Sequence, residues 1–207
     1  MKIILIIISL IPLICSSQNN PDSKIYSLIL SEQLSSWEMD LDTISHIVIT
    51  DNLTKFSKEH GTSLDFLSEG DNYYAYQLSG YNEKMVRFIK NNEFDTLIYR
   101  YNQVINEDAN FESEQFKLKV PVLILDHSKI EKLFSRRNLE GSWRKFYRKN
   151  PTSPGYFEFS KIAYTENYAI VYFVHRAKPL IGFGGLEILI KDNDEWTSYA
   201  YINLWNN

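Results

Sequence analysis

The sequence predicts an α+β fold, in which N-terminal helices and short strands pack on a C-terminal antiparallel four-stranded meander. Three observations support this prediction. Apolar and aromatic residues recur in short runs over residues 157–205, turn-forming residues separate those runs, and apolar residues of the front half recur mostly at helical spacing. Because 44% of the residues are hydrophobic and 14% are aromatic, the chain has enough apolar surface for a well-packed core.

Residues 1–17 differ in composition from the rest and are predicted to be a signal peptide. Lys2 precedes an almost wholly aliphatic stretch of about a dozen residues, shorter than the roughly 20 that span a bilayer as a helix. Cys15 and Ser17 place small side chains where a signal peptidase requires them, so we expect cleavage after Ser17 and an exported protein, periplasmic or secreted. In the alternative, a lipid on Cys15 anchors the protein, although Ile14 stands where a small residue usually precedes such a cysteine.

The mature chain is predicted to be a polar tether, residues 18–23, followed by one domain, residues 24–207, without a transmembrane segment. Asp22 or Ser23 is placed to cap a first helix over residues 24–37. A short β-branched run, residues 46–50, predicts a buried strand, and residues 52–60 predict a second helix. The chain has one cysteine, Cys15, so its core is expected to be stable without a disulfide.

The middle of the chain continues with alternating helical and extended signals. Residues 64–81 predict loop with short helical pieces, and apolar residues at helical spacing predict a helix over residues 83–106. Residues 116–125 predict a second strand, which Pro121 places at a sheet edge or a bulge. Ser128 and Glu131 match a capping box, which predicts a short helix over residues 129–134. The basic residues 136–150 predict a last helix, which Pro151 ends.

The four C-terminal runs read FEFSKIAY, YAIVYFVHRA, GLEILI and WTSYAYINLW. Residues 165–167, 178–185 and 191–195 separate them and contain the Asn, Asp, Gly or Pro that a chain reversal requires. Both faces of residues 168–177 are almost entirely apolar, which indicates a sheet covered on both sides at its middle. We therefore expect the earlier helices to pack on this meander.

A set of spaced aromatic, proline, glycine and turn residues resembles a pattern in uncharacterised exported proteins of Bacteroidota-type bacteria. These residues are Trp143, Phe146, Pro151, Ser153, Gly155, Phe159, Ser160, Ala169, Val171, Tyr172, Gly182, Gly184, Lys191 and Trp196, with residues 25–30 and 47–49 in the front half. The resemblance covers most of the mature chain and implies an exported bacterial domain. It implies no active site.

Two apolar runs end in a carboxylate, at Asp51 and at Asp126. Carboxylates at the ends of neighbouring strands can hold a metal ion or serve as an acid and a base. In the interpretation that we favour, each caps the helix predicted to follow it, because a side-chain oxygen accepts free backbone N–H groups there. A metal site requires the two strands to be neighbours with aligned ends.

None of the four histidines stands at zinc-ligand spacing from another histidine or a cysteine, so no metal or other cofactor is expected. His175 lies at the end of the most apolar strand and is a candidate general base if a carboxylate pairs with it. The interpretation that we favour is a solvent-facing or hydrogen-bonded histidine at a strand end.

Two short motifs are better explained by structure than by ligand binding. The glycines of residues 182–185 precede a predicted strand rather than a helix, so they indicate a bulge or a close backbone approach and not a nucleotide site. Residues 192–194 resemble part of a calcium loop but lack its glycine and its later glutamate, which indicates a turn. The GxSxG signature of serine hydrolases and the HExxH signature of zinc proteases are absent from the sequence.

Strict alternation in the last run places Tyr199, Tyr201, Asn203 and Trp205 on one face and residues 200, 202 and 204 on the other. An aromatic face of this kind is a candidate ligand-binding surface for a sugar or a peptide. The interpretation that we favour is that the N-terminal helices cover it.

The sequence thus predicts an exported binding or interaction module without catalytic activity, whose partner is a protein or a small ligand. The alternative is a small extracytoplasmic hydrolase that uses His175 or Asp126, and a third possibility is an immunity, inhibitor or assembly protein. The net charge of −4 and the pI near 5.6 come from residues of mixed sign, so we expect neither nucleic acid nor an anionic membrane surface as the partner.

Overall fold

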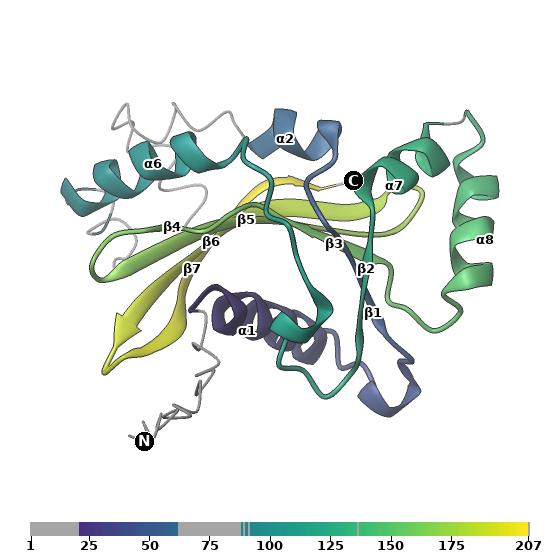
Figure 1. Ribbon diagram of the computed structural model, residues 1–207, viewed down its shortest axis with the longest axis horizontal. Coiled ribbons are helices and arrows are strands. Elements are labelled where there is room, and N and C mark those ends of the chain that lie inside the picture. Colours follow the sequence, from purple (N-terminus) through teal and green to yellow (C-terminus); the bar gives the residue numbers. More distant parts are fainter. Residues whose placement is uncertain (1–20, 62–87, 89, 91, 136, 207) are drawn as a thin grey trace, which may run out of the picture.

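A seven-stranded sheet with helices on both faces forms the framework of the protein (Figure 1). The computed structural model describes residues 21–61, 88, 90, 92–135 and 137–206. The strand order is β2-β1-β3-β5-β6-β7, and β4 pairs with β5 beside this path. The mixture of helices and sheet confirms the predicted α+β class.

Three short parallel strands continue into a long antiparallel part. The parallel strands are β1 (Ile47–Thr50), β2 (Val122–Leu125) and β3 (Tyr156–Phe159), and the antiparallel ones that follow β3 are β5 (Tyr168–Lys178), β6 (Ile181–Asp192) and β7 (Glu195–Asn206). The first predicted C-terminal run is divided into β3 and the two-residue strand β4 (Ala163–Tyr164). The sheet is therefore larger than a four-stranded meander, because β1 and β2 extend it beyond β3.

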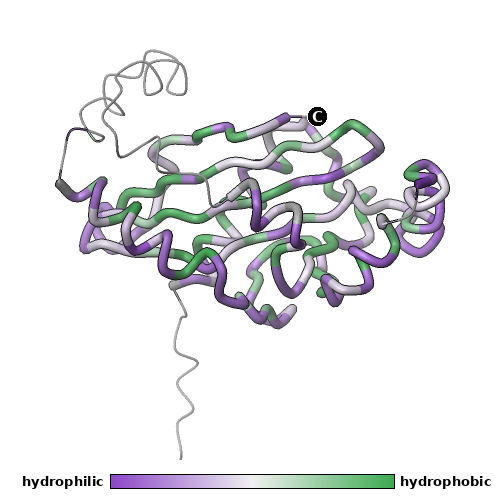
Figure 2. The backbone as a smooth tube through the Cα atoms, turned by 90° about the horizontal axis from the view of Figure 1, so that it is seen from above, coloured by the Kyte–Doolittle hydropathy of each residue, from purple (hydrophilic) through white to green (hydrophobic). Residues whose placement is uncertain are grey.

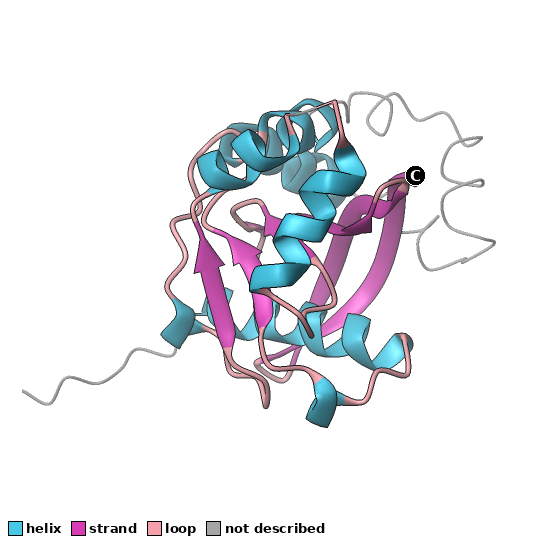
Figure 3. Cartoon of the chain, turned by 90° about the vertical axis from the view of Figure 1, so that its right-hand side faces the viewer, coloured by secondary structure: helices cyan, strands magenta, loops and turns pink. Residues whose placement is uncertain are grey.

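Helices cover both faces of this sheet (Figures 1 and 3). One face carries α1 (Pro21–Ser36), and the other carries α2 (Lys55–Gly61), α6 (Asn92–Val104), α7 (His127–Phe134) and, at the end near β1 and β2, α8 (Leu139–Lys149). Two short 3-10 helices, η1 (Leu41–Thr43) and η2 (Ser113–Gln115), lie in the connections. None of these described helices is long and apolar enough to cross a bilayer.

Three clusters of buried apolar residues fill the space between the sheet and the helices. On the α1 face, Ile25, Ile29 and Leu30 share one cluster with Phe157 and Phe173 of the sheet. On the opposite face, one cluster joins α6 to β5, β6 and β7, and another joins α7 and α8 to Val48 and Tyr156. The predicted coverage of the sheet on both sides is therefore observed.

Most predicted helices and strands of the front half are present, with shifted ends. The second helix begins at Lys55, and the second strand is limited to Val122–Leu125, at the sheet edge that Pro121 indicated. The helix predicted over residues 83–106 is observed from Asn92, whereas residues 83–87 and the loop predicted over 64–81 lie outside the described residues. The predicted glycine-rich connection is shorter than expected, because β6 begins at Ile181.

The predicted face of Tyr199, Tyr201, Asn203 and Trp205 does not form. Two register shifts between β6 and β7 each leave one extra residue in β7. At the first shift, the adjacent residues Ile188 and Leu189 pair with Ala200 and Ser198. At the second, the adjacent residues Gly184 and Gly185 pair with Trp205 and Asn203. Each bulge reverses the alternation of side chains. Tyr199 and Trp205 consequently pack with the α6 cluster, whereas Tyr201 packs with the α1 cluster.

Candidate functional site

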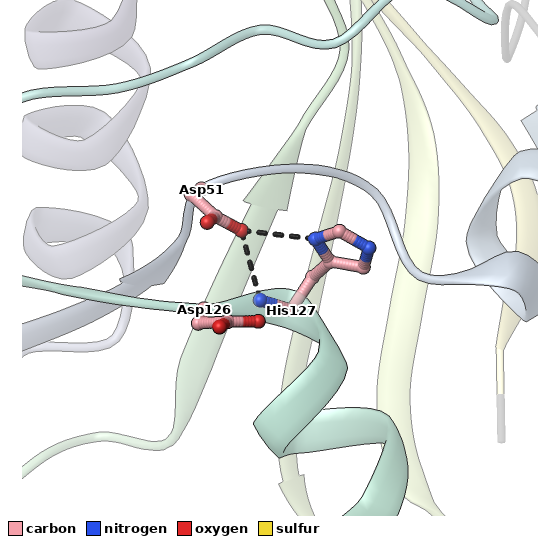
Figure 4. Close-up of side chains that lie close together, drawn as sticks. All are labelled: Asp51, Asp126 and His127. Atoms are coloured by element: carbon pink, nitrogen blue, oxygen red, sulfur yellow. Dashed lines mark hydrogen bonds and ion pairs between the residues drawn. The ribbon is translucent and has the colours of Figure 1, made fainter.

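The carboxyl ends of β1 and β2 bring two predicted site residues together. Thr50 pairs with Leu125 in the parallel ladder, so Asp51 and Asp126 follow at the same edge of the sheet. The Oδ1 atom of Asp51 accepts the backbone N–H of His127 at 2.8 Å and lies 3.1 Å from its ring Nδ1 (Figure 4). Ligand atoms of Asp51, Asp126 and His127 all lie within 4.8 Å of one another.

Both carboxylates serve the amino-terminal end of α7. Asp126 is its N-cap residue and accepts the Ser128 N–H at 2.8 Å and the Ser128 hydroxyl at 2.6 Å, and these hydrogen bonds lower the pKa of Asp126. The interpretation of Asp126 as a helix cap therefore matches the structure. Asp51 also serves α7 and not the helix that follows it in the chain. Negative charge at this end of a helix is stabilised by the helix dipole.

The hydrogen bonds to α7 bear on whether Asp51, Asp126 and His127 form a metal site. The strands are neighbours with aligned ends, as a metal site requires, and two carboxylates with one imidazole are reasonable ligands for a divalent ion. However, one oxygen of each carboxylate already accepts hydrogen bonds from α7, and His127 Nδ1 already faces Asp51. Capping of α7 explains the cluster without a bound ion.

His175 lies elsewhere, in the core on the α1 face of the sheet. It is 6% exposed, its Nε2 lies 3.0 Å from the carbonyl oxygen of Pro154, and its ring contacts Trp37 and Phe157 at centroid distances of 4.4 and 4.7 Å. Burial lowers its pKa to about 4, so the ring is neutral at pH 7. The structure shows a hydrogen-bonded histidine and does not join it to Asp51 or Asp126 among the described residues.

The three candidate aromatic residues of β7 make separate contacts. Tyr199 packs against Tyr168 with ring centroids 5.8 Å apart, and the Trp205 Nε1–H donates to the Tyr172 hydroxyl at 2.8 Å. Tyr201 packs against Phe173 on the other face. They form no common surface for a flat ligand.

A cationic groove, which sequence reasoning missed, lies between β2, α7 and α8 and encloses about 520 Å³. Its floor is apolar and contains Leu123, Leu125, Ile130, Leu133 and Phe146. Its rim is cationic and contains Lys129, Lys132, Lys145, Arg148 and Lys149, all of them exposed. Asn150 completes the lining, and we refer to these eleven residues as the α7–α8 groove.

The cations of the groove are not held in ion pairs by the part of the protein that the structure describes. None of its five cations forms an ion pair with a carboxylate among the described residues. Residues 127–149 contain eight Lys or Arg and two Glu, although the whole chain has a net charge of −4. Figure 2 shows α8 as a largely hydrophilic helix at the edge of the molecule. A charge count in this window was the sequence signal that could have revealed the groove.

A second polar arrangement that sequence reasoning missed links the start of β1 to the end of α8. Asn150 Nδ2 donates to the Phe146 carbonyl at 3.1 Å, so its Oδ1 accepts from His46 Nε2–H at 3.0 Å. His46 Nδ1 is then the acceptor for the Ser45 hydroxyl at 2.9 Å. This serine–histidine–amide order orients the imidazole as a base toward the hydroxyl.

Comparison with known proteins gave no match to a protein-family model, to a curated protein or to a solved structure. The resemblance to exported Bacteroidota-type proteins therefore stays a prediction.

Proposed function

We propose that this protein is a non-catalytic binding module that acts outside the cytoplasm and holds an anionic partner in the α7–α8 groove. One observation carries the proposal: five exposed cations, none of them in an ion pair among the described residues, surround an apolar floor. An anionic partner with apolar parts would meet both surfaces. Neither the buried His175 nor the helix cap Asp126 supports catalysis.

The five cations lie around one groove and therefore close to one another. Like charges that lie within a Debye length of about 10 Å repel one another, so gathering five cations around one groove destabilises the isolated protein. The same arrangement attracts an anion, and its potential persists locally although the chain as a whole is acidic. The volume of about 520 Å³ is that of a site for a small ligand or a short chain segment. We therefore do not propose a nucleic acid duplex as the partner.

The test uses charge reversal with a matched control. The variant K132E/K149E reverses two groove cations, and the control K90E/K178E reverses two exposed cations elsewhere, with the same change in net charge. We expect fluorescein-labelled poly-L-glutamate to bind the wild type at about 50 mM NaCl and to dissociate as salt rises. The groove variant should bind at least about tenfold more weakly, and the control within about twofold of the wild type. Absence of binding, or equal loss in both variants, would exclude the groove as the site.

The proposed location outside the cytoplasm rests on the predicted signal peptide, residues 1–17. Intact-mass measurement of the exported protein tests it, with Gln18 as the expected first residue. A measured mass that includes Cys15 with an attached lipid would instead show that the exported protein is anchored to a membrane.

A hydrolase is the second candidate function, and the Ser45–His46–Asn150 arrangement is the observation that favours it. Ser45 is exposed, and Asn150 also lines the α7–α8 groove, so a bound partner would come near the hydroxyl. A fluorophosphonate probe that labels the wild type and not S45A would support this candidate. An unlabelled wild type would leave the three residues as a structural link between β1 and α8.

A further inference from the structure

We propose that the partner is an extended acidic peptide that adds as a strand to the outer edge of β2, the last strand of the described sheet. This inference rests on the proposed function and names the class of ligand. The side chains of the proposed peptide alternate. Acidic side chains face the cations of the α7–α8 groove, and apolar side chains face the opposite side of the sheet.

The first support comes from the backbone of β2, which is the terminal strand of the described sheet. The carbonyl oxygens of Pro121 and Leu125 accept the N–H groups of Ile47 and Asp51, each at 2.9 Å. In a parallel ladder, residues that bond to one neighbour alternate with residues that point away from it. The N–H and C=O groups of Val122 and Ile124 therefore face the outer edge, where no described strand pairs with them.

The second support comes from the two faces of β2. Leu123, which is 38% exposed, and Leu125 line the α7–α8 groove. Val122 and Ile124 point to the other face and pack, half-buried, against the α1 cluster. In a strand added beside β2, successive side chains also alternate between these faces. One face of such a peptide meets cations and the other meets aliphatic side chains.

The distribution of charge favours a peptide over a lipid headgroup. The five cations come from two helices, with Lys129 and Lys132 on α7 and Lys145, Arg148 and Lys149 on α8. A row of carboxylates along an extended chain can approach cations on both helices, whereas a single headgroup places its charge at one point. Four of the five are lysines, whose compact charges do not require the planar geometry that arginine selects.

Four probes test the inference on the protein from Gln18 onward. The first is a fluorescein-labelled peptide of about eight alternating Glu and Val residues, and the second has the same composition in block order. The third is the alternating peptide with every backbone nitrogen methylated, which cannot donate ladder hydrogen bonds whether it adds parallel or antiparallel to β2. Phosphatidylglycerol vesicles are the fourth. We expect the alternating peptide to bind at least about tenfold more tightly than the other two peptides and to lose this preference in K132E/K149E.

The outcomes separate this inference from the proposed function. Equal affinity for all three peptides would overturn strand addition and leave an anionic partner in place. Binding of vesicles without binding of any peptide would overturn the peptide class. If poly-L-glutamate, peptides and vesicles all fail to bind, the proposed function fails together with the inference.

Discussion

Two titratable side chains that face the α1 side of the sheet are shifted by burial in opposite directions. Glu187, 4% exposed, has its pKa raised to about 7, mainly by burial, and a hydrogen bond from Ser198 opposes this shift in part. His175, 6% exposed, has its pKa lowered to about 4. Both groups are therefore favoured in their neutral forms in the folded protein.

These shifts predict opposite dependences of stability on pH. Above pH 4.5 the unfolded chain releases the proton of Glu187, whereas the folded protein keeps it up to about pH 7. The contribution of Glu187 to the free energy of unfolding therefore declines as pH rises from 4.5 to about 7. The unfolded chain protonates His175 below pH 6.5, where the folded protein does not, so stability declines as pH falls from 6.5 to about 4. Between pH 4.5 and 6.5 the two contributions offset each other.

Replacing either Glu187 or His175 should expose the pH dependence of stability that the remaining residue contributes. We expect the free energy of unfolding of E187Q to rise with pH between 4.5 and 6.5, and that of H175Q to fall, each by up to about 1.4 kcal/mol per pH unit relative to the wild type. Urea unfolding at several pH values measures this. The double variant is the control and should return to the wild-type slope. Unchanged slopes in both single variants would contradict the shifts.

At the scale of elements, helices receive caps from residues distant in the chain. The first residue of α7 donates to Asp51, and the N–H groups of Thr54 and Lys55 at the start of α2 donate to Glu158 and Glu131. Glu158 is fully buried on β3, and Arg176 Nε lies 3.7 Å from it. Such caps join helices to the sheet, and local sequence predicts only those within one element, such as Asp126.

The capping of α7 predicts a graded loss of stability. We expect D126A to lower the free energy of unfolding, because one N-cap acceptor is lost. D51A should cost more, about 1 to 2 kcal/mol, because the His127 N–H and ring lose the same acceptor. D51N retains an acceptor oxygen and should lie between D51A and the wild type. Urea unfolding at pH 7 measures all three, and a D51A variant as stable as the wild type would contradict the role assigned to Asp51.

The bulges of β7 show why alternation failed at its candidate aromatic face. Gly184 and Gly185 lie opposite the second bulge, and a Cβ on Gly185 would lie 2.5 Å from the Ile202 carbonyl oxygen. A Cβ on Gly184 would collide with the Trp205 indole. The glycines thus permit β7 to approach closely, as the sequence indicated, but the position of the bulge depends on the partner strand.

At the scale of the molecule, tryptophans report on all three apolar clusters. Trp37 and Trp196 pack with the α1 cluster, Trp205 with the α6 cluster and Trp143 with the α7–α8 cluster. If residues 24–207 form one domain, urea unfolding followed by tryptophan fluorescence and by circular dichroism should give coincident transitions.

Core truncations extend this test to each cluster. We expect I29A, L97A and F146A each to lower the stability of the single transition by about 2 to 5 kcal/mol, because each leaves a cavity in a different cluster. A separate early transition in F146A alone would show that α7 and α8 unfold independently.

The sequence alone determined the α+β class, the positions of most described helices and strands, and Asp126 as a helix cap, because spacing of apolar residues and cap chemistry are local signals. Only the tertiary structure decided that β1 and β2 extend the sheet in parallel, that Asp51 serves α7, and that the lysines of α7 join the cations of α8 around an apolar floor. These features depend on which segments become neighbours. Pairing of distant segments reflects packing of the whole chain, and no local window of sequence contains it.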